Sequence, residues 1–170
     1  MTLTPATEED IAEVSRQLGR PARDIVAIAA RCICGKPVVV HTAPRLSDGT
    51  PFPTTYYLTH RAATAAVSTL EASGFMATLQ DRLGEDAELA VAYQNAHEAY
   101  IADRDKTAHE LGLEIPEIDG ISAGGMPTRV KCLHALIGHS LAAGPGVNPI
   151  GDAALAACSW SPNLCACESY

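Results

Sequence analysis

The sequence predicts an α+β fold that is dominated by helices and contains a small antiparallel sheet of about three strands, covered by helices on one side. Short segments rich in Val, Ile, Thr and Tyr are concentrated before residue 60, and apolar residues recur at helical spacing after it. The chain has 170 residues, of which 47% are hydrophobic, so it is long enough to bury one core. We therefore expect a single domain over residues 1–170, with residues 161–170 as a flexible tail that contains cysteines.

The first third of the chain is expected to form one helix and three strands. Residues 8–18 have a helical apolar stripe, and Thr7 with Asp10 resembles the capping box that begins many helices. The expected strands cover residues 24–32, 37–42 and 54–59. The alanines of the first of these segments leave a helix open as an alternative.

The remainder of the chain is expected to be helical. The four longer helices cover residues 62–72, 75–83, 87–111 and 128–142. A fifth, short helix is expected to be capped by Asp152. Residues 112–127 have no helical period and end in a glycine pair followed by Pro127, so we interpret them as a hinge or an active-site loop.

The charge of the chain excludes some partners. Its formal net charge is -8, and its 12 Lys and Arg residues are spread along the whole length, so we expect neither nucleic acid nor an anionic membrane as a partner. No segment approaches the roughly 20 apolar residues that span a bilayer, and the first residues are acidic where a signal peptide would be basic. We therefore expect a cytoplasmic protein, whose thiols stay reduced and are available for metal binding or redox chemistry.

Six cysteines are the most informative residues for function, because four of them form two Cys-x-Cys pairs. The pairs are Cys32 with Cys34 and Cys165 with Cys167, and a fifth thiol, Cys132, lies near two histidines. Thiolates and imidazoles are preferred ligands of zinc and of iron–sulfur clusters. The sequence therefore predicts a zinc or iron–sulfur site, although neither pair has the Cys-x-x-Cys spacing of the strongest signatures.

Simple geometry selects the expected ligands. In an extended segment alternate side chains point the same way, which brings the Cα atoms of Cys32 and Cys34 to roughly 6.6 Å from each other. On the helix expected at residues 128–142, Cys132 and His139 share a face. The predicted metal ligands are therefore Cys32, Cys34, Cys132 and His139. The tail cysteines are alternative partners for Cys132, and the competing interpretations are redox-active thiols without metal or inert, buried cysteines.

A second candidate site precedes the helix expected at residues 128–142. A glycine pair followed by cations near a helix N-terminus is typical of a site for phosphate or a carboxylate, because free amides and the helix dipole favour an anion. The predicted anion-binding residues are Gly124, Gly125, Arg129, Lys131 and His134. The alternative is a glycine-rich turn with both cations in solvent. A P-loop is excluded, because its spacing and its upstream strand are missing.

Other titratable residues have weaker patterns. His97 and Glu98, on the long helix, are candidates for an acid and a base. His41 and His60 flank the expected strands and are candidate imidazole ligands near Cys32. The chain has no G-x-S-x-G, H-E-x-x-H or Rossmann motif, which excludes the common hydrolase, metalloprotease and dinucleotide-binding classes.

Three segments carry a family resemblance: LGRPARDIVAIAARC, TAPRLSDGTPFPTTYYLT and GGMPTRVKCLHALIGHSLAAGPGVNPIGD. Over nearly its whole length the chain resembles the bacterial family called domain of unknown function 501, and in particular its actinobacterial members. The resemblance implies a cytoplasmic bacterial protein, and it supplies no activity, cofactor or substrate. It also implies that Cys32, Cys132, His134, His139 and Asn148 occupy motif positions of the family, whereas Cys34 and the tail cysteines are less typical of it.

Two functions from different classes stay open, and the sequence does not decide whether the chain is an enzyme. In the first, thiols and a histidine hold a metal that activates a bound group or water, and the glycine-led loop receives a small anionic substrate. In the second, the cysteines are structural, and the loop around Phe52, Tyr56 and Tyr57 presents an apolar surface to another bacterial protein.

Overall fold

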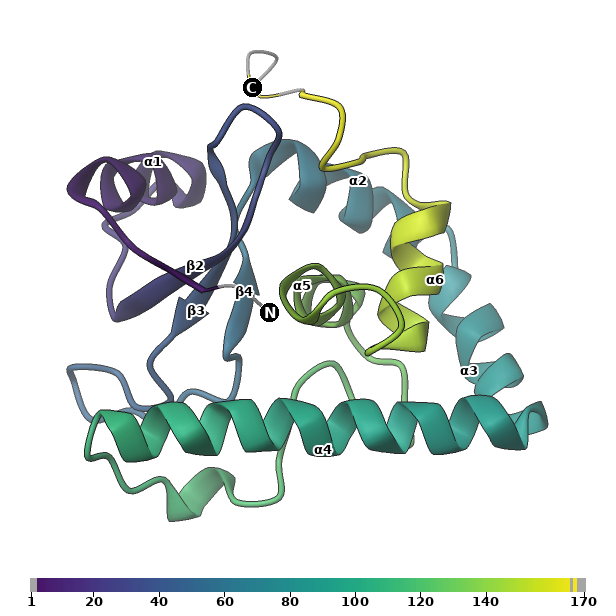
Figure 1. The fold of residues 1–170 in the computed structure, drawn as a ribbon. Coiled ribbons are helices and arrows are strands. Elements are labelled where there is room, and N and C mark those ends of the chain that lie inside the picture. The colour runs from purple at the N-terminus through teal and green to yellow at the C-terminus, as the bar shows by residue number, and fades with distance from the viewer. Residues whose placement is uncertain (1–2, 166, 168–170) are drawn as a thin grey trace.

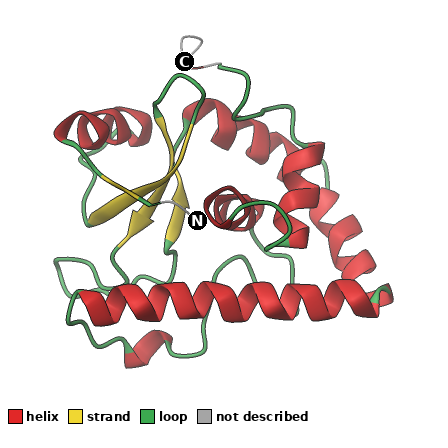
Figure 2. Cartoon of the chain, viewed as in Figure 1, coloured by secondary structure: helices red, strands yellow, loops and turns green. Residues whose placement is uncertain are grey.

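The computed structural model describes residues 3–165 and residue 167, and it has an α+β architecture, as the sequence predicts (Figures 1 and 2). The strands are β1 (Thr4–Pro5), β2 (Ile25–Arg31), β3 (Pro37–Thr42) and β4 (Tyr56–Leu58). The helices are α1 (Glu8–Leu18), α2 (Arg61–Ala72), α3 (Phe75–Glu85), α4 (Ala87–Glu110), α5 (Leu133–Ala143) and α6 (Pro149–Ala157), with a 3-10 turn η1 (Pro116–Ile118). No helix in this described part is long and apolar enough to cross a membrane.

The four strands form one antiparallel sheet in the order β1-β2-β3-β4. The sequence predicts about three strands, and the additional one is β1. It has only two residues, one of them Pro5, so it lacks the length and the alternating pattern by which a strand is recognised.

Helices cover both faces of the sheet, whereas the sequence leads us to expect helices on one side (Figure 2). Helix α1 begins with the predicted capping box of Thr7 and Asp10, and its buried Val14 packs on Ile28 and Val40 of the sheet. Because adjacent strand residues point to opposite faces, Val39 of the same strand packs into the larger core on the side of α5. The second face is covered because the apolar stripe of α1 is buried against it, while α5 and the larger core occupy the first face.

Helix α5 lies at the centre of the molecule (Figure 1). Leu133, Leu136 and Ile137 are fully buried among the sheet, α2 and α6, so this helix has no polar face. At Gly138, a Cβ atom would lie 2.9 Å from the backbone oxygen of Tyr56, which shows how closely α5 approaches β4.

The long helix α4 has a buried stripe, which includes Tyr93, Ala96 and Tyr100. Farther along the same helix, the guanidinium of Arg104 is fully buried and donates hydrogen bonds to the carbonyls of Ile118 and Ile121. The segment after α4 is therefore fixed to the helix by a buried cation.

Two helix starts differ from the sequence prediction. Helix α5 begins at Leu133 and not at residue 128, because the backbone before it makes other contacts: Val130 N–H donates to the Oε1 atom of Gln80, and the Tyr93 hydroxyl donates to the carbonyl of Arg129. Helix α6 begins at Pro149 and is capped by Asn148, upstream of the predicted cap.

Candidate metal centre

The turn between β2 and β3 carries the first Cys-x-Cys pair. Cys32 N–H donates to the carbonyl of Lys36, and Gly35 N–H donates to the carbonyl of Cys32, so the turn is closed by backbone hydrogen bonds. Gly35 has a φ of 90°, a conformation that favours glycine. As a result Cys32 is buried in the core and Cys34 is exposed beside it.

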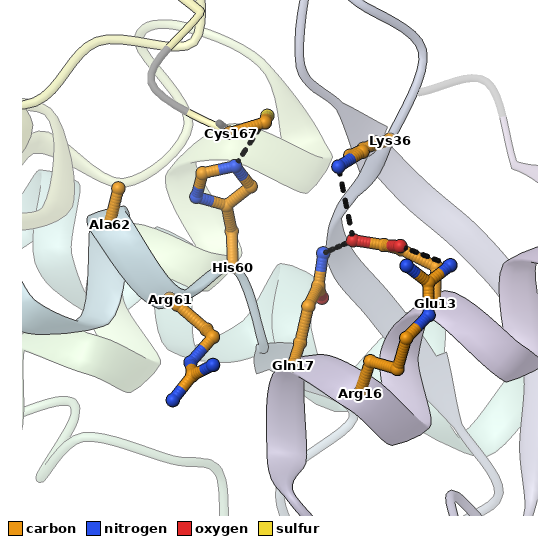
Figure 3. A pocket seen from close by; sticks show the side chains of 8 residues that line it. All are labelled: Glu13, Arg16, Gln17, Lys36, His60, Arg61, Ala62 and Cys167. Carbon is orange, nitrogen blue, oxygen red and sulfur yellow. Dashed lines mark hydrogen bonds and ion pairs between the residues drawn. The ribbon is translucent and has the colours of Figure 1, made fainter. Parts of the chain in front are cut away.

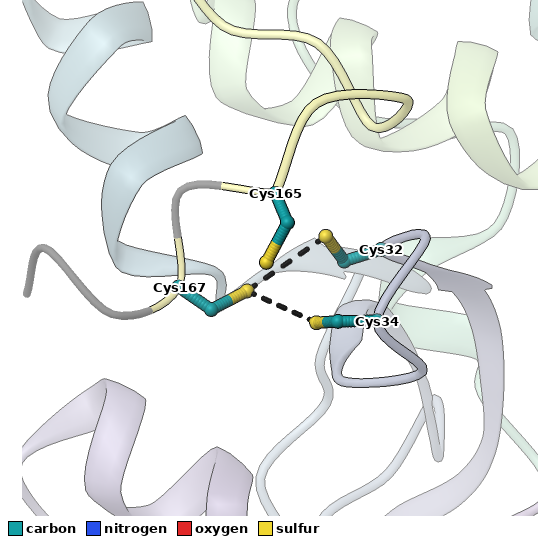
Figure 4. A group of neighbouring side chains, drawn as sticks. All are labelled: Cys32, Cys34, Cys165 and Cys167. Carbon is teal, nitrogen blue, oxygen red and sulfur yellow. Dashed lines mark hydrogen bonds between the residues drawn. The ribbon is translucent and has the colours of Figure 1, made fainter.

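The C-terminal tail brings the second pair to this turn (Figure 4). After α6 the chain buries Trp160, whose ring centroid lies 5.5 Å from that of His60, and the Ile33 N–H then donates a 3.0 Å hydrogen bond to the carbonyl of Pro162. Cys165 and Cys167 follow directly. The tail therefore lies on the hairpin turn, although about 130 residues separate the two pairs in sequence.

The four thiols form a compact group in which all sulfur atoms lie within 4.8 Å of one another. The Cys167 Sγ atom is 3.3 Å from that of Cys34 and 3.7 Å from that of Cys32. Four thiolates at about 2.3 Å from a single tetrahedral zinc ion would lie about 3.8 Å apart. All four cysteines are free, and their arrangement can hold a metal ion such as zinc.

The surroundings of these thiols change their acidity in opposite directions. Hydrogen bonding from the Lys36 backbone lowers the pKa of Cys34 to about 7, whereas burial raises the pKa of Cys32 and of Cys167. A thiolate is therefore readily available at one position of the group, while the more buried sulfurs keep their protons until a cation replaces them.

His60 supports the group from the start of α2. Its Nδ1 atom accepts the N–H of Ala63 as a helix cap, and its Nε2 atom lies 3.0 Å from the Cys167 sulfur. Because Nδ1 accepts the Ala63 N–H, the ring proton is on Nε2, where it faces the sulfur, and burial lowers the pKa of the ring. Sequence reasoning places this histidine near Cys32 as a candidate ligand, and the structure places it as a hydrogen-bond donor to a different cysteine of the group.

A pocket of about 310 Å³ opens beside the thiols, and His60 and Cys167 form part of its wall (Figure 3). Three cationic side chains also line it, Arg16, Lys36 and Arg61, together with the single carboxylate of Glu13. Glu13 contacts Arg16 at 2.6 Å and Lys36 at 3.7 Å. The pocket therefore has an excess of positive charge next to the cysteine group.

The structure does not bring Cys132 and His139 into the group that contains Cys32 and Cys34. Cys132 precedes α5 with an extended backbone (φ −152°, ψ 107°), so the shared helical face expected for these two residues does not exist. His139 is fully buried: its Nδ1 atom is 3.2 Å from the Asn148 amide nitrogen, and its ring stacks on Tyr56.

Cys132 belongs instead to a second group, with Glu71 and His134, in which one ligand atom from each residue lies within 4.8 Å of the others. A hydrogen bond from His134 lowers the pKa of Cys132, and its bond with Cys132, together with the nearby carboxylate of Glu71, raises the pKa of His134 to about 9. Glu71 has no sequence signal of its own, because only the packing of α2 against α5 places it there.

Four of the five predicted anion-binding residues, Gly124, Gly125, Arg129 and Lys131, lie in a closed loop before α5, whereas the fifth, His134, is in α5 itself. Gly124 and Gly125 accept backbone hydrogen bonds from Lys131 and Arg129 respectively, and both glycines have positive φ values. The first amide of α5, that of Leu133, donates to the carboxylate of Glu71. A protein carboxylate therefore occupies the position at which an anion was expected, and anion binding by this loop stays a prediction.

The other candidates are separated in the structure. His97 has an Nδ1 atom 2.8 Å from the Ser122 hydroxyl and lies away from either thiol group, and His41 contacts Thr107. Phe52 and Tyr57 line a mostly apolar pocket of about 250 Å³. Tyr56, in contrast, is buried in the core, so it does not contribute to an apolar surface for a partner.

Comparison with known proteins identifies a family match. A family model described as "Protein of unknown function (DUF501)" matches residues 28–156. The search of curated proteins and the search of solved structures found no match. The matched region contains Cys32, Cys34 and the whole second group, and it ends before Cys165 and Cys167. Because the match covers well over half of the sequence, the chain belongs to the DUF501 family.

Proposed function

We propose that this protein binds one structural zinc ion through Cys32, Cys34, Cys165 and Cys167, and that the ion fixes the C-terminal tail to the turn between β2 and β3. The observation that carries the proposal is that four sulfur atoms, from two segments about 130 residues apart in sequence, lie within 4.8 Å of one another.

The spacing of the sulfurs favours a single ion over an iron–sulfur cluster. In a cluster the four thiolates bind different iron atoms, so their sulfurs must spread around several metal positions. The observed separations of 3.3 and 3.7 Å are close to the edge of a tetrahedron around one ion, about 3.8 Å for zinc. Four thiolates suit zinc well, and the hydrogen bond from His60 to Cys167 adds outer-shell support.

The number of ligands argues for a structural role. Four protein ligands fill a tetrahedral zinc site and leave no position for water or substrate, whereas catalytic zinc sites usually have three. Apart from the Ile33–Pro162 hydrogen bond and the burial of Trp160, few described contacts hold the tail on the turn. A metal bound here would supply the main attachment of the tail.

Metal analysis tests the proposal. For protein purified without oxygen and without chelators, Cys34→Ser and Cys167→Ser are each expected to contain one zinc equivalent less than the unmodified protein. Cys158→Ser is the matched control, because Cys158 belongs to neither thiol group and its replacement is expected to leave the metal content unchanged. Equal zinc content in all four proteins would refute the proposal. A brown, iron-containing protein would show that the bound metal is iron and not zinc.

A second candidate function is the binding of a small anion in the pocket beside the metal. It is favoured by the three cations of that pocket, of which Arg61 belongs to no ion pair among the described residues. Calorimetric titration with inorganic phosphate is expected to show binding that Arg61→Gln weakens, with Arg20→Gln, at a residue that lines a different pocket, as the control. Absence of binding to the unmodified protein would exclude this function.

A further inference from the structure

The group of Glu71, Cys132 and His134 is separate from the four-cysteine group and shares no residue with it. Glu71 lies near the end of α2, Cys132 immediately precedes α5, and His134 is in the first turn of α5. The Nδ1 atom of His134 is 3.2 Å from Oε1 of Glu71. Three donor types that bind divalent transition metals, a sulfur, a nitrogen and a carboxylate oxygen, therefore meet where two helices touch.

The surrounding hydrogen bonds orient two of the three donors. On the far side of the His134 ring, Nε2 is 3.2 Å from the carbonyl oxygen of Thr64, an atom that can only accept a hydrogen bond. Nε2 therefore carries a proton, and Nδ1, which faces Glu71, is the nitrogen that exchanges its proton for a metal ion. This is the outer-shell arrangement common to metal-binding histidines. The Leu133 N–H holds the Glu71 carboxylate in place at 2.6 Å.

One donor atom from each of Glu71, Cys132 and His134 lies within 4.8 Å of the other two. In the metal-free protein a proton on Nδ1 joins His134 to Glu71, and a divalent cation that replaces this proton binds all three atoms together. We infer that this group binds a second divalent transition-metal ion, such as Zn²⁺, with Glu71, Cys132 and His134 as its three protein ligands.

The set of ligands also indicates the class of metal site. Three protein ligands leave one tetrahedral position for water or a small ligand, which is the arrangement of catalytic zinc sites. The side chains of His134 and Glu71 are 28% and 23% exposed, so solvent reaches the group. Sulfur and imidazole donors disfavour Mg²⁺ and Ca²⁺, which prefer oxygen ligands. The inference does not depend on the proposed structural zinc.

Titration with Co²⁺ alone tests the inference, because cobalt bound to thiolate has a charge-transfer absorption that protein without a bound thiolate lacks. The titration uses the full chain in two backgrounds. In the unmodified protein two equivalents are expected, and Cys132→Ser and His134→Ala are each expected to remove one. In the Cys34→Ser/Cys167→Ser double variant, one equivalent with the absorption of a single thiolate is expected to remain, and adding Cys132→Ser is expected to abolish it.

Two further variants separate metal binding from folding. Glu71→Gln keeps an oxygen that accepts the Leu133 N–H, so it preserves the start of α5 while it removes the carboxylate ligand, and it is expected to lose the second equivalent while circular dichroism stays unchanged. Cys158→Ser is expected to keep both equivalents. The inference is overturned if the unmodified protein binds one equivalent that Cys132→Ser leaves intact, since a proton and not a metal would then join the three side chains. A Cys34→Ser variant that loses one equivalent and keeps the one bound by Cys132 would support two independent sites, because it removes only the structural zinc.

Discussion

The buried imidazole of His139 should make the stability of this protein fall steeply below neutral pH. His139 is fully buried against Tyr56 and Tyr100, and burial lowers its pKa from about 6.5 to about 4. The unfolded chain therefore binds the proton more readily than the folded protein does. The resulting stabilisation is complete above pH 6.5 and is lost as the pH falls toward 4. The difference in pKa corresponds to about 3 kcal/mol at 1.36 kcal/mol per pH unit.

The assay is urea unfolding of the protein and of His139→Gln at several pH values between 7 and 4. Glutamine carries no charge at any of these pH values. The free energy of unfolding of His139→Gln should therefore fall by about 3 kcal/mol less over this range than that of the unmodified protein. Contributions from other groups, including the buried His41 and any loss of metal, affect both proteins and cancel in the difference. Parallel pH profiles would refute the reasoning. If the variant does not fold, an NMR titration of the unmodified protein decides, since a His139 midpoint near 6.5 contradicts the argument.

Three other perturbations have defined outcomes. Asp10→Asn removes the ion pair with Arg31, whose nitrogen atoms lie 2.6 and 2.8 Å from the carboxylate, and should lower the free energy of unfolding by about 2 kcal/mol. Because Arg31 holds the pKa of Asp10 well below its usual range, this difference in stability should persist at neutral pH and vanish in strong acid. An equal loss of stability at all pH values would contradict this reasoning. Gly138→Ala should cost about 1–3 kcal/mol in chemical denaturation, because its Cβ would lie 2.9 Å from the Tyr56 backbone, whereas Gly84→Ala in open space should stabilise by up to about 1 kcal/mol. A zinc chelator should speed proteolysis after α6 and change the fluorescence of Trp160, and an unchanged cleavage pattern would argue against a metal-held tail.

Local patterns in the sequence were sufficient for most of the fold. The capping box of α1 depends on residues three positions apart, and the buried stripe of α4 repeats every turn, so both are visible without knowledge of the rest of the chain. The start of α5 could not be predicted in this way. Its upstream residues are held out of the helix by Gln80 and Tyr93, which belong to α3 and α4.

The candidate sites show the same distinction. Each Cys-x-Cys pair is a local signal, and the sequence identified it as such. The combination of the two pairs depends on where the tail lies after α6, and the combination of Cys132 with Glu71 depends on how α2 packs on α5. Cys132 and His139 would share a helical face if the helix began at residue 128. Tertiary hydrogen bonds hold the preceding residues out of the helix, which begins at Leu133, so this assignment is wrong.

The position of the two groups in the fold leads to different consequences of metal loss. Among the described residues, the fully buried part of the core around α5 ends at Ala154 apart from Trp160, and Cys158 and Cys167 pack against it only partly buried, so the burial of this core depends little on the tail cysteines. Removing an ion from the four-cysteine group should therefore release the tail locally and leave the cooperative unfolding of the core little changed. Cys132 and Glu71, in contrast, lie at the contact of α2 with α5, and the Glu71 carboxylate also caps α5. A cation bound there joins two helices of the core, so its loss should appear in the free energy of global unfolding.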